Sequence, residues 1–108
     1  MINADKRDAV VLLTLHRPEK RNCLHPDMIQ DLSTELEQAA NDAAVRVLVI
    51  TGAGASFCAG LDVTHVLSLD KKAKIHYLGT FFSLFRQIHA LRQPVIASNQ
   101  RSSDRRRV

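Results

Sequence analysis

The sequence of 108 residues contains no tryptophan, one tyrosine and only two cysteines. Cys23 and Cys58 lie far apart and form no CxxC motif, so we expect reduced thiols rather than a disulfide framework. Cys23 and His25 are the only close pair of potential metal ligands, and a structural zinc site needs four. We therefore expect these two side chains to be polar surface groups, and we predict no metal site.

Long apolar runs are also missing from the sequence. No run approaches the roughly 20 residues that a membrane-spanning helix needs. The first residues are polar and mixed in charge, without the basic and then apolar stretches of a secretory signal. These absences predict a cytoplasmic protein with no membrane partner, while mitochondrial and peroxisomal locations stay open.

Positive charge is in excess, but most of the excess lies at the C-terminal end. The formal net charge is +4, and the four arginines and one aspartate of residues 101–108 account for three of these charges. No aromatic residue lies near them to stack on a nucleic-acid base. We therefore predict no nucleic-acid partner, and we assign residues 1–97 to a folded segment and residues 98–108 to a divergent polar, Arg-rich tail.

The remaining pattern is that of an α/β fold. Residues 9–15 and 45–51 are continuous apolar runs, which are typical of strands covered on both faces of a parallel sheet. Between them, Pro26 and Asp27 begin a run with apolar residues at helical spacing to about residue 40. A second helical pattern follows from Asp70 to about Leu91, and residues 94–97 predict a third parallel strand.

The loop Gly52–Gly60 is rich in small residues, but it fits no nucleotide-binding motif. Phe57 stands where the dinucleotide fingerprint needs its third glycine, and Gly60 is followed by Leu61 rather than by the lysine of a phosphate loop. Cys58 has apolar neighbours, so we expect a small buried hydrophobic side chain rather than a nucleophile. By itself the loop indicates a tight strand-to-helix turn.

Three motifs in order carry a family resemblance. They are Arg17-Pro-Glu-Lys-Arg-Asn-Cys-Leu24, then Val45-Arg-Val-Leu-Val-Ile-Thr-Gly-Ala-Gly54, then Phe57-Cys-Ala-Gly-Leu-Asp62. With the helix and the Pro94-Val-Ile-Ala97 strand that follow, residues 9–97 resemble the N-terminal portion of the crotonase superfamily of enoyl-CoA hydratases and isomerases. The resemblance implies a partial crotonase-like (ClpP/crotonase) fold, with a parallel sheet and crossover helices.

The resemblance also implies a site and a substrate class. Such enzymes hold an acyl-CoA thioester so that two backbone N–H groups stabilise an enolate-like charge on its oxygen. The matching position for one of these donors is the amide of Leu61. Coenzyme A, as part of the substrate and with no other cofactor, is expected near a set of residues in the first and third motifs: Lys20, Cys23, Ala59, Gly60, Leu61, Asp62 and Val63. Lys20 or Arg21 is the candidate partner for a phosphate.

The sequence departs from the family pattern after residue 97. The glycine-rich segment that supplies the second oxyanion donor is missing, and every glutamate precedes the first donor. The resemblance thus implies either an acyl-CoA enzyme of fatty-acid metabolism, truncated and inactive alone, or a non-catalytic remnant. Such a remnant would bind coenzyme A or associate with full-length relatives. The family's trimer or hexamer is expected, although the elements of its interfaces are largely missing here.

Overall fold

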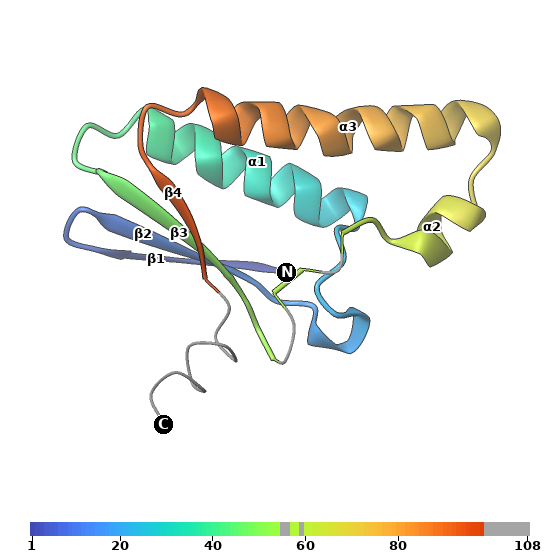
Figure 1. Cartoon of the computed structure of the whole chain (residues 1–108), viewed down its shortest axis with the longest axis horizontal. Helices are drawn as coiled ribbons and strands as arrows, with labels where there is room; N and C mark the ends of the chain where they lie inside the picture. Colours follow the sequence, from blue (N-terminus) through green and yellow to red (C-terminus); the bar gives the residue numbers. More distant parts are fainter. Residues whose placement is uncertain (55–56, 59, 99–108) are drawn as a thin grey trace.

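The computed structural model describes residues 1–54, 57–58 and 60–98, and the predicted tail from residue 99 onward lies outside them. Four strands form one sheet in the order β1-β2-β3-β4 (Figure 1). Their bounds are Ile2–Arg7 for β1, Val10–Leu15 for β2, Val47–Gly52 for β3 and Val95–Ser98 for β4. The pairs β2–β3 and β3–β4 are parallel, as the sequence predicts.

The two long helices also match the sequence prediction. Helix α1 spans Pro26–Ala40 and α3 spans Lys71–Ala90. Asp70 caps α3, because its side chain accepts a hydrogen bond of 2.8 Å from the amide of Ala73. Two short elements were not predicted: the 3-10 turn η1, Pro18–Lys20, and the helix α2, Val63–Leu67.

Strand β1 is a further element that was not predicted from the sequence. Ile2 to Arg7 pair antiparallel with β2, and the connecting turn places Asp8 at a φ of 54°. Every residue of β1 after Ile2 is exposed, so the strand carries no apolar pattern that sequence reasoning could detect. It is held by backbone hydrogen bonds at the sheet edge, and its polar side chains face solvent.

The expectation that the strands are covered on both faces is wrong for this chain. Helices α1 and α3 lie on one side of the sheet (Figure 1). Along β2 the buried residues Val11, Leu13 and Leu15 alternate with half-buried Leu12 and Thr14, and in β4 Ile96 is 51% exposed. The core therefore forms between one sheet face and α1, which contributes a set of buried apolar side chains: Met28, Ile29, Leu32, Leu36 and Ala39.

Candidate functional site

The first and third sequence motifs meet at the end of the sheet. The amide of Leu24 donates a hydrogen bond of 2.7 Å to the carbonyl of Gly60, and Leu24 and Leu61 form an isolated parallel bridge. The loop before α1 and the segment before α2 are thereby held side by side (Figure 1). The candidate site is built on this contact.

An ion pair between half-buried Arg17 and buried Asp62 joins the same two motifs. Arg17 Nη1 lies 2.8 Å from Asp62 Oδ2, with side-chain exposures of 16% and 7%, and it also donates to the carbonyl of Cys23. The other Asp62 oxygen accepts from the amide of His65 and so caps α2. Burial by itself raises the pKa of Asp62, but the hydrogen bonds from Arg17 and His65 outweigh it and leave this pKa below its ordinary value.

Asn22 fastens the first motif to the end of β3. Its Oδ1 accepts from the amide of Arg17 at 2.8 Å, and its Nδ2 donates to the carbonyl of Ala53 at 2.9 Å. Arg21 and Asn22 both have φ values near the left-handed region, 55° and 57°, which closes the loop tightly. Asn22 is fully buried, so these bonds also satisfy a side chain that burial would otherwise penalise.

The amide of Leu61 differs from the backbone groups on either side of it, which are both hydrogen-bonded. The carbonyl of Gly60 accepts from Leu24, and the amide of Asp62 donates to the hydroxyl of Tyr77 at 3.0 Å. Within residues 1–54, 57–58 and 60–98, no acceptor is bonded to the Leu61 amide. Gly60 has a φ of 92°, and open space lies where a Cβ of residue 60 would point. As far as the described residues go, this N–H group can therefore donate a hydrogen bond to a ligand oxygen.

The other predicted site residues differ in exposure and in whether they line a hollow. Exposed Lys20 and buried Asp62 both line a hollow of about 280 Å³, together with Arg17, His25, Thr64, His65 and Ser68. Val63 is 64% exposed at the start of α2, and Ala59 lies outside the described residues. Both carboxylate oxygens of Asp62 are bonded within the chain, so its side chain is engaged in holding the loop.

The two cysteines are free thiols, as expected. The expectation that Cys23 is a polar surface group is wrong, because only 8% of it is exposed and its sulfur lies 3.6 Å from Arg17 Nη1. Cys58 is half-buried, and this burial raises the pKa of its thiol. In the part of the chain that the structure describes, no three histidine, cysteine or acidic side chains gather as a metal site would require.

Sequence reasoning missed two residues of the site. They are Arg17, which carries the ion pair with Asp62, and Tyr77, which is 3% exposed and bonded to both motifs. A signal was present for Tyr77, since a single hydroxyl on the apolar face of a helix needs a partner when buried. No such signal exists for Arg17, because its acidic partner is 45 positions away.

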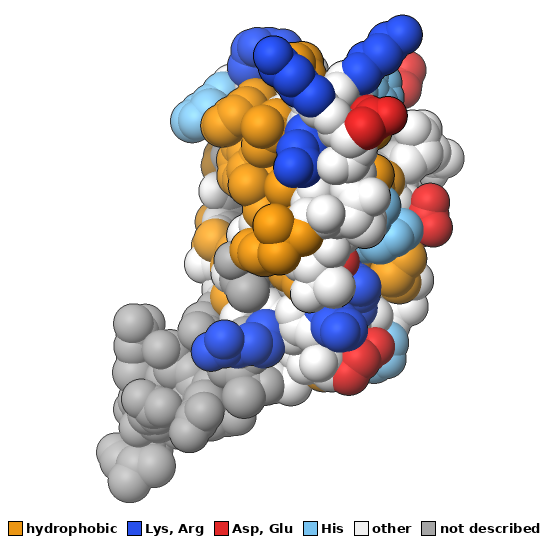
Figure 2. Space-filling model, turned by 90° about the vertical axis from the view of Figure 1, so that its right-hand side faces the viewer, with side chains coloured by type: hydrophobic (Ala, Val, Ile, Leu, Met, Phe, Trp, Pro, Cys, Tyr) orange, Lys and Arg blue, Asp and Glu red, His pale blue; other side chains and the backbone are white. Residues whose placement is uncertain are grey.

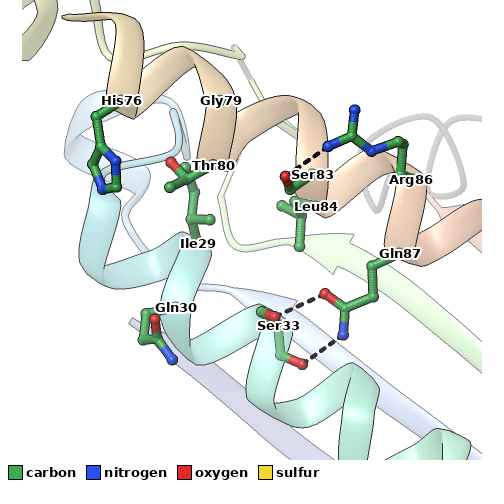
Figure 3. A pocket seen from close by; sticks show the side chains of 10 residues that line it. All are labelled: Ile29, Gln30, Ser33, His76, Gly79, Thr80, Ser83, Leu84, Arg86 and Gln87. Atoms are coloured by element: carbon green, nitrogen blue, oxygen red, sulfur yellow. Dashed lines mark hydrogen bonds between the residues drawn. The ribbon is translucent and has the colours of Figure 1, made fainter. Parts of the chain in front are cut away.

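A second hollow, of about 460 Å³, lies between α1 and α3 (Figure 3). The side chains of Ser33 and Gln87 face each other there: Ser33 Oγ donates to Gln87 Oε1, and Gln87 Nε2 donates to the Ser33 carbonyl. These bonds fix α3 against α1. They therefore help to hold Tyr77 over the junction of the two motifs.

Comparison with known proteins identifies the family. The sequence model of the family described as enoyl-CoA hydratase/isomerase matches residues 5–100. The chain belongs to this family. The resemblance to the crotonase superfamily and the predicted fold class are thereby confirmed.

Individual members of the enoyl-CoA hydratase/isomerase family are similar over most of this chain. The 2,3-dehydroadipyl-CoA hydratase of Escherichia coli K12 is 37% identical over 93 residues, which are 86% of this chain and 36% of that protein. The short-chain-enoyl-CoA hydratase of Clostridium acetobutylicum is 31% identical, over 87% of this chain and 36% of that protein. A crystal structure of an enoyl-CoA hydratase from Bacillus anthracis has a TM-score of 0.86 at 31% identity, covering 89% of this chain and 38% of its own. The chain thus spans less than two-fifths of the length of these relatives.

The lowered pKa of Asp62 predicts a loss of stability in acid. A group whose pKa is lower in the folded state stabilises that state above its unfolded pKa, about 3.9 for aspartate, and the contribution disappears as the pH falls toward the folded value. We expect the urea midpoint of the chain to fall steeply below about pH 4, and to fall less steeply in Asp62→Asn.

The exposed pair of Lys6 and Asp42 provides the control for this pH series. The hydrogen bond from Lys6 also lowers the pKa of Asp42, but the pair lies in solvent, where concentrated salt screens it. Measured in about 1 M salt, where the screening length is about 3 Å, Asp42→Asn should follow the unmodified chain. If the urea midpoints of Asp62→Asn and of the unmodified chain fall in the same way with pH, the loss of stability in acid does not come from Asp62.

Proposed function

We propose that this chain binds the thioester of an acyl-CoA and polarises its carbonyl through the amide of Leu61. In this proposal the chain forms half of an oxyanion hole for an enolate-like intermediate of 2-enoyl-CoA hydration or double-bond migration. The observation that carries the proposal is the Leu61 N–H group, which has no acceptor within the described residues while the groups on both sides of it are bonded. A fixed donor of this kind contributes on the order of 100-fold to the rate in enzymes that form oxyanions.

The surroundings of Leu61 support the approach of a thioester. Because Gly60 has no side chain and open space adjoins it, an acyl group can lie against the backbone at this point. The ion pair of Arg17 and Asp62 and the side chain of Asn22 fix the two loops that frame the position. The donor is thus preorganised, which is the condition for electrostatic stabilisation of a developing charge.

The coenzyme A moiety is proposed to lie along the hollow beside Lys20. Lys20 is exposed at the end of η1. Among the described residues it is the only lysine that lines this hollow and it has no ion-pair partner, so its ammonium group can approach a phosphate. Exposed Arg21 follows it directly and is the second candidate. In this proposal coenzyme A passes from Lys20 along Gly60, Asp62 and Val63 toward the thioester. Buried Cys23 lies beneath the coenzyme A.

Neither glutamate of α1 lines the hollow beside Lys20. Glu35 lines a hollow with Lys6 and Asp42, and Glu37 lines one with Arg92. Both lie in the second half of α1, and Glu35 is nine positions, or roughly 13 Å at 1.5 Å per residue, along the helix from Pro26. The proposal therefore assigns thioester binding and polarisation to this chain, with the acid and base on other groups.

Amide chemical shifts of the ¹⁵N-labelled chain test the proposal. Crotonyl-CoA is added in one series and free coenzyme A in a matched series. We expect the Leu61 amide proton to move downfield with crotonyl-CoA only, and residues around Lys20 to shift with both ligands. A Leu61 resonance that responds equally to the two ligands, or to neither, would refute thioester binding at this amide.

The second candidate function is association with a longer family member. Exposed apolar side chains favour it: Ile96 on the edge strand β4 is 51% exposed, Leu67 on α2 is 74% exposed and Ile75 on α3 is 62% exposed. Figure 2 shows hydrophobic side chains gathered beside lysines and arginines on the end of the molecule that carries α2 and the start of α3. Co-purification with a full-length enoyl-CoA hydratase, abolished by Ile96→Lys, would support this candidate.

A further inference from the structure

Tyr77 is a buried polar group that lies outside the sequence motifs. It is on α3, it is 3% exposed, and its ring meets the ring of His65 edge to face with centroids 5.3 Å apart. Its hydroxyl donates a hydrogen bond to the carbonyl of Leu24 and accepts one from the amide of Asp62. One hydroxyl thus joins the loop before α1 to the segment before α2.

The hydroxyl occupies a position in the bridge between Leu24 and Leu61. A regular parallel bridge at this pair contains two direct bonds, from the amide of Leu24 to the carbonyl of Gly60 and from the amide of Asp62 to the carbonyl of Leu24. The first bond is present at 2.7 Å. At the second, the Tyr77 hydroxyl bonds to both groups: it accepts from the amide of Asp62 and donates to the carbonyl of Leu24.

This arrangement fixes the peptide planes on both sides of Leu61. A trans peptide is planar, so the Leu61 N–H points away from the direction of the Gly60 carbonyl, which is bonded to Leu24. The next plane is held by the bond from the Asp62 amide to Tyr77. With both planes anchored, the Leu61 N–H keeps one direction, away from the Leu24 loop.

We propose that Tyr77 is a positioning residue that holds the Leu61 amide in the orientation needed to bind a thioester oxygen. The inference rests on the proposed function, because it names the group that aims the donor assigned there. The hydroxyl acts through the backbone and does not itself touch the ligand. A residue that served only to fill the core would need the ring alone, whereas this role needs the oxygen.

Tyr77→Phe separates the two roles, because it keeps the ring and removes the hydroxyl. In the free chain we expect hydrogen exchange at the Asp62 amide to become at least about tenfold faster, since one bonded partner is lost. With crotonyl-CoA we expect the shift of the Leu61 amide to shrink and the affinity to fall about tenfold, a change of about 1.4 kcal/mol. The affinity for free coenzyme A should not change.

Thr80→Val is the matched control. Thr80 lies one turn along α3 and its hydroxyl donates to the carbonyl of Tyr77 within the same helix, so this variant also removes one α3 hydroxyl. It should leave exchange at Asp62 and binding of crotonyl-CoA unchanged. If Tyr77→Phe behaves like Thr80→Val in both measurements, the positioning role is overturned.

A second measurement covers the case in which Tyr77→Phe does not fold. Tyr77 is the only tyrosine of the chain, so biosynthetic incorporation of 3,5-difluorotyrosine labels this position alone. Fluorination makes the hydroxyl more acidic, whereas burial raises the pKa of the natural Tyr77 hydroxyl. As the fluorinated hydroxyl ionises it can no longer donate to Leu24, and binding of crotonyl-CoA should fall with pH in the labelled chain only. Parallel pH profiles would overturn the inference.

The two levels of the proposal fail in different ways. If the Leu61 amide of the unmodified chain does not respond to crotonyl-CoA, the proposed function fails, whatever Tyr77 does. If it responds, and Tyr77→Phe leaves both the response and the exchange at Asp62 intact, only the role of Tyr77 fails. Hydrogen exchange in the free chain tests the bond from the Asp62 amide to the Tyr77 hydroxyl, and no ligand is needed for that measurement.

Discussion

Arg17→Met is expected to lower the free energy of unfolding by about 3 kcal/mol, the low end of the range for breaking a buried ion pair, because buried Asp62 loses the charge of half-buried Arg17. Asp62 would keep its capping bond from His65 but lose the guanidinium that compensates its charge. The carbonyl of Cys23 would lose a donor as well. Because methionine retains much of the apolar stem of arginine, the decrease in the free energy of unfolding comes from the lost charge and its hydrogen bonds. Urea denaturation followed by circular dichroism measures it.

Two controls accompany Arg17→Met. Lys6→Met breaks the Lys6–Asp42 pair, which has a similar length of 3.0 Å but side-chain exposures of 46% and 40%, and it should change stability little. The double variant Arg17→Met with Asp62→Asn removes both charges while asparagine can still cap α2, so it should be more stable than the sum of the single changes predicts. Equal effects of Arg17→Met and Lys6→Met would show that burial does not distinguish the two pairs.

The helices and the parallel strands could be predicted because their signals are local. Pro26 and Asp70 mark helix starts, and the apolar residues that follow recur at helical spacing. Strand β1 could not be predicted in this way, because an edge strand in which every residue after Ile2 is exposed has no apolar period. Strand β1 forms because its backbone pairs with β2, and backbone hydrogen bonds do not depend on the type of side chain.

The site was predictable only to the level of its motifs. The resemblance indicated Leu61 and the residues around it, since those motifs are contiguous in the sequence. The contacts that hold Leu61 in place are long-range: Arg17 reaches Asp62 across 45 positions, and Tyr77 reaches Leu24 across 53. Such pairs depend on the way α3 crosses back over the loops, and a single sequence does not encode that crossing in any local pattern.

The roles of the quoted motif residues change once these contacts are known. Asp62 was expected near coenzyme A, yet its carboxylate holds Arg17 and caps α2. Asn22 closes the loop with a left-handed φ of 57°, and it also fastens the loop to the end of β3 through Ala53. The polar members of the motifs thus form a frame around the backbone of Gly60 and Leu61, and the proposed function places the ligand at the Leu61 amide.

Gly60→Ala is the second large expected effect, and it acts on this open backbone. At a φ of 92° an alanine is strained by about 1–3 kcal/mol, although no neighbouring atom lies within 4 Å of the added Cβ. Relief of that strain would turn the Gly60 carbonyl away from Leu24 and rotate the Leu61 amide with it. We expect a lower urea midpoint together with an affinity for crotonyl-CoA at least about tenfold weaker, which corresponds to about 1.4 kcal/mol.

Gly79→Ala is the matched control, since it adds the same methyl group where open space also lies around it, but inside α3 at an ordinary φ. There alanine should raise the stability by about 0.5–1 kcal/mol, because glycine loses more backbone freedom in a helix. Gly79 lines the hollow between α1 and α3 and not the thioester position, so crotonyl-CoA should bind as before (Figure 3). Opposite signs for the two variants would locate the strain at Gly60, because the added atoms are identical and only the backbone conformation differs. A Gly60→Ala chain that matches Gly79→Ala in stability and binding would mean that the left-handed turn is not needed to aim the Leu61 amide.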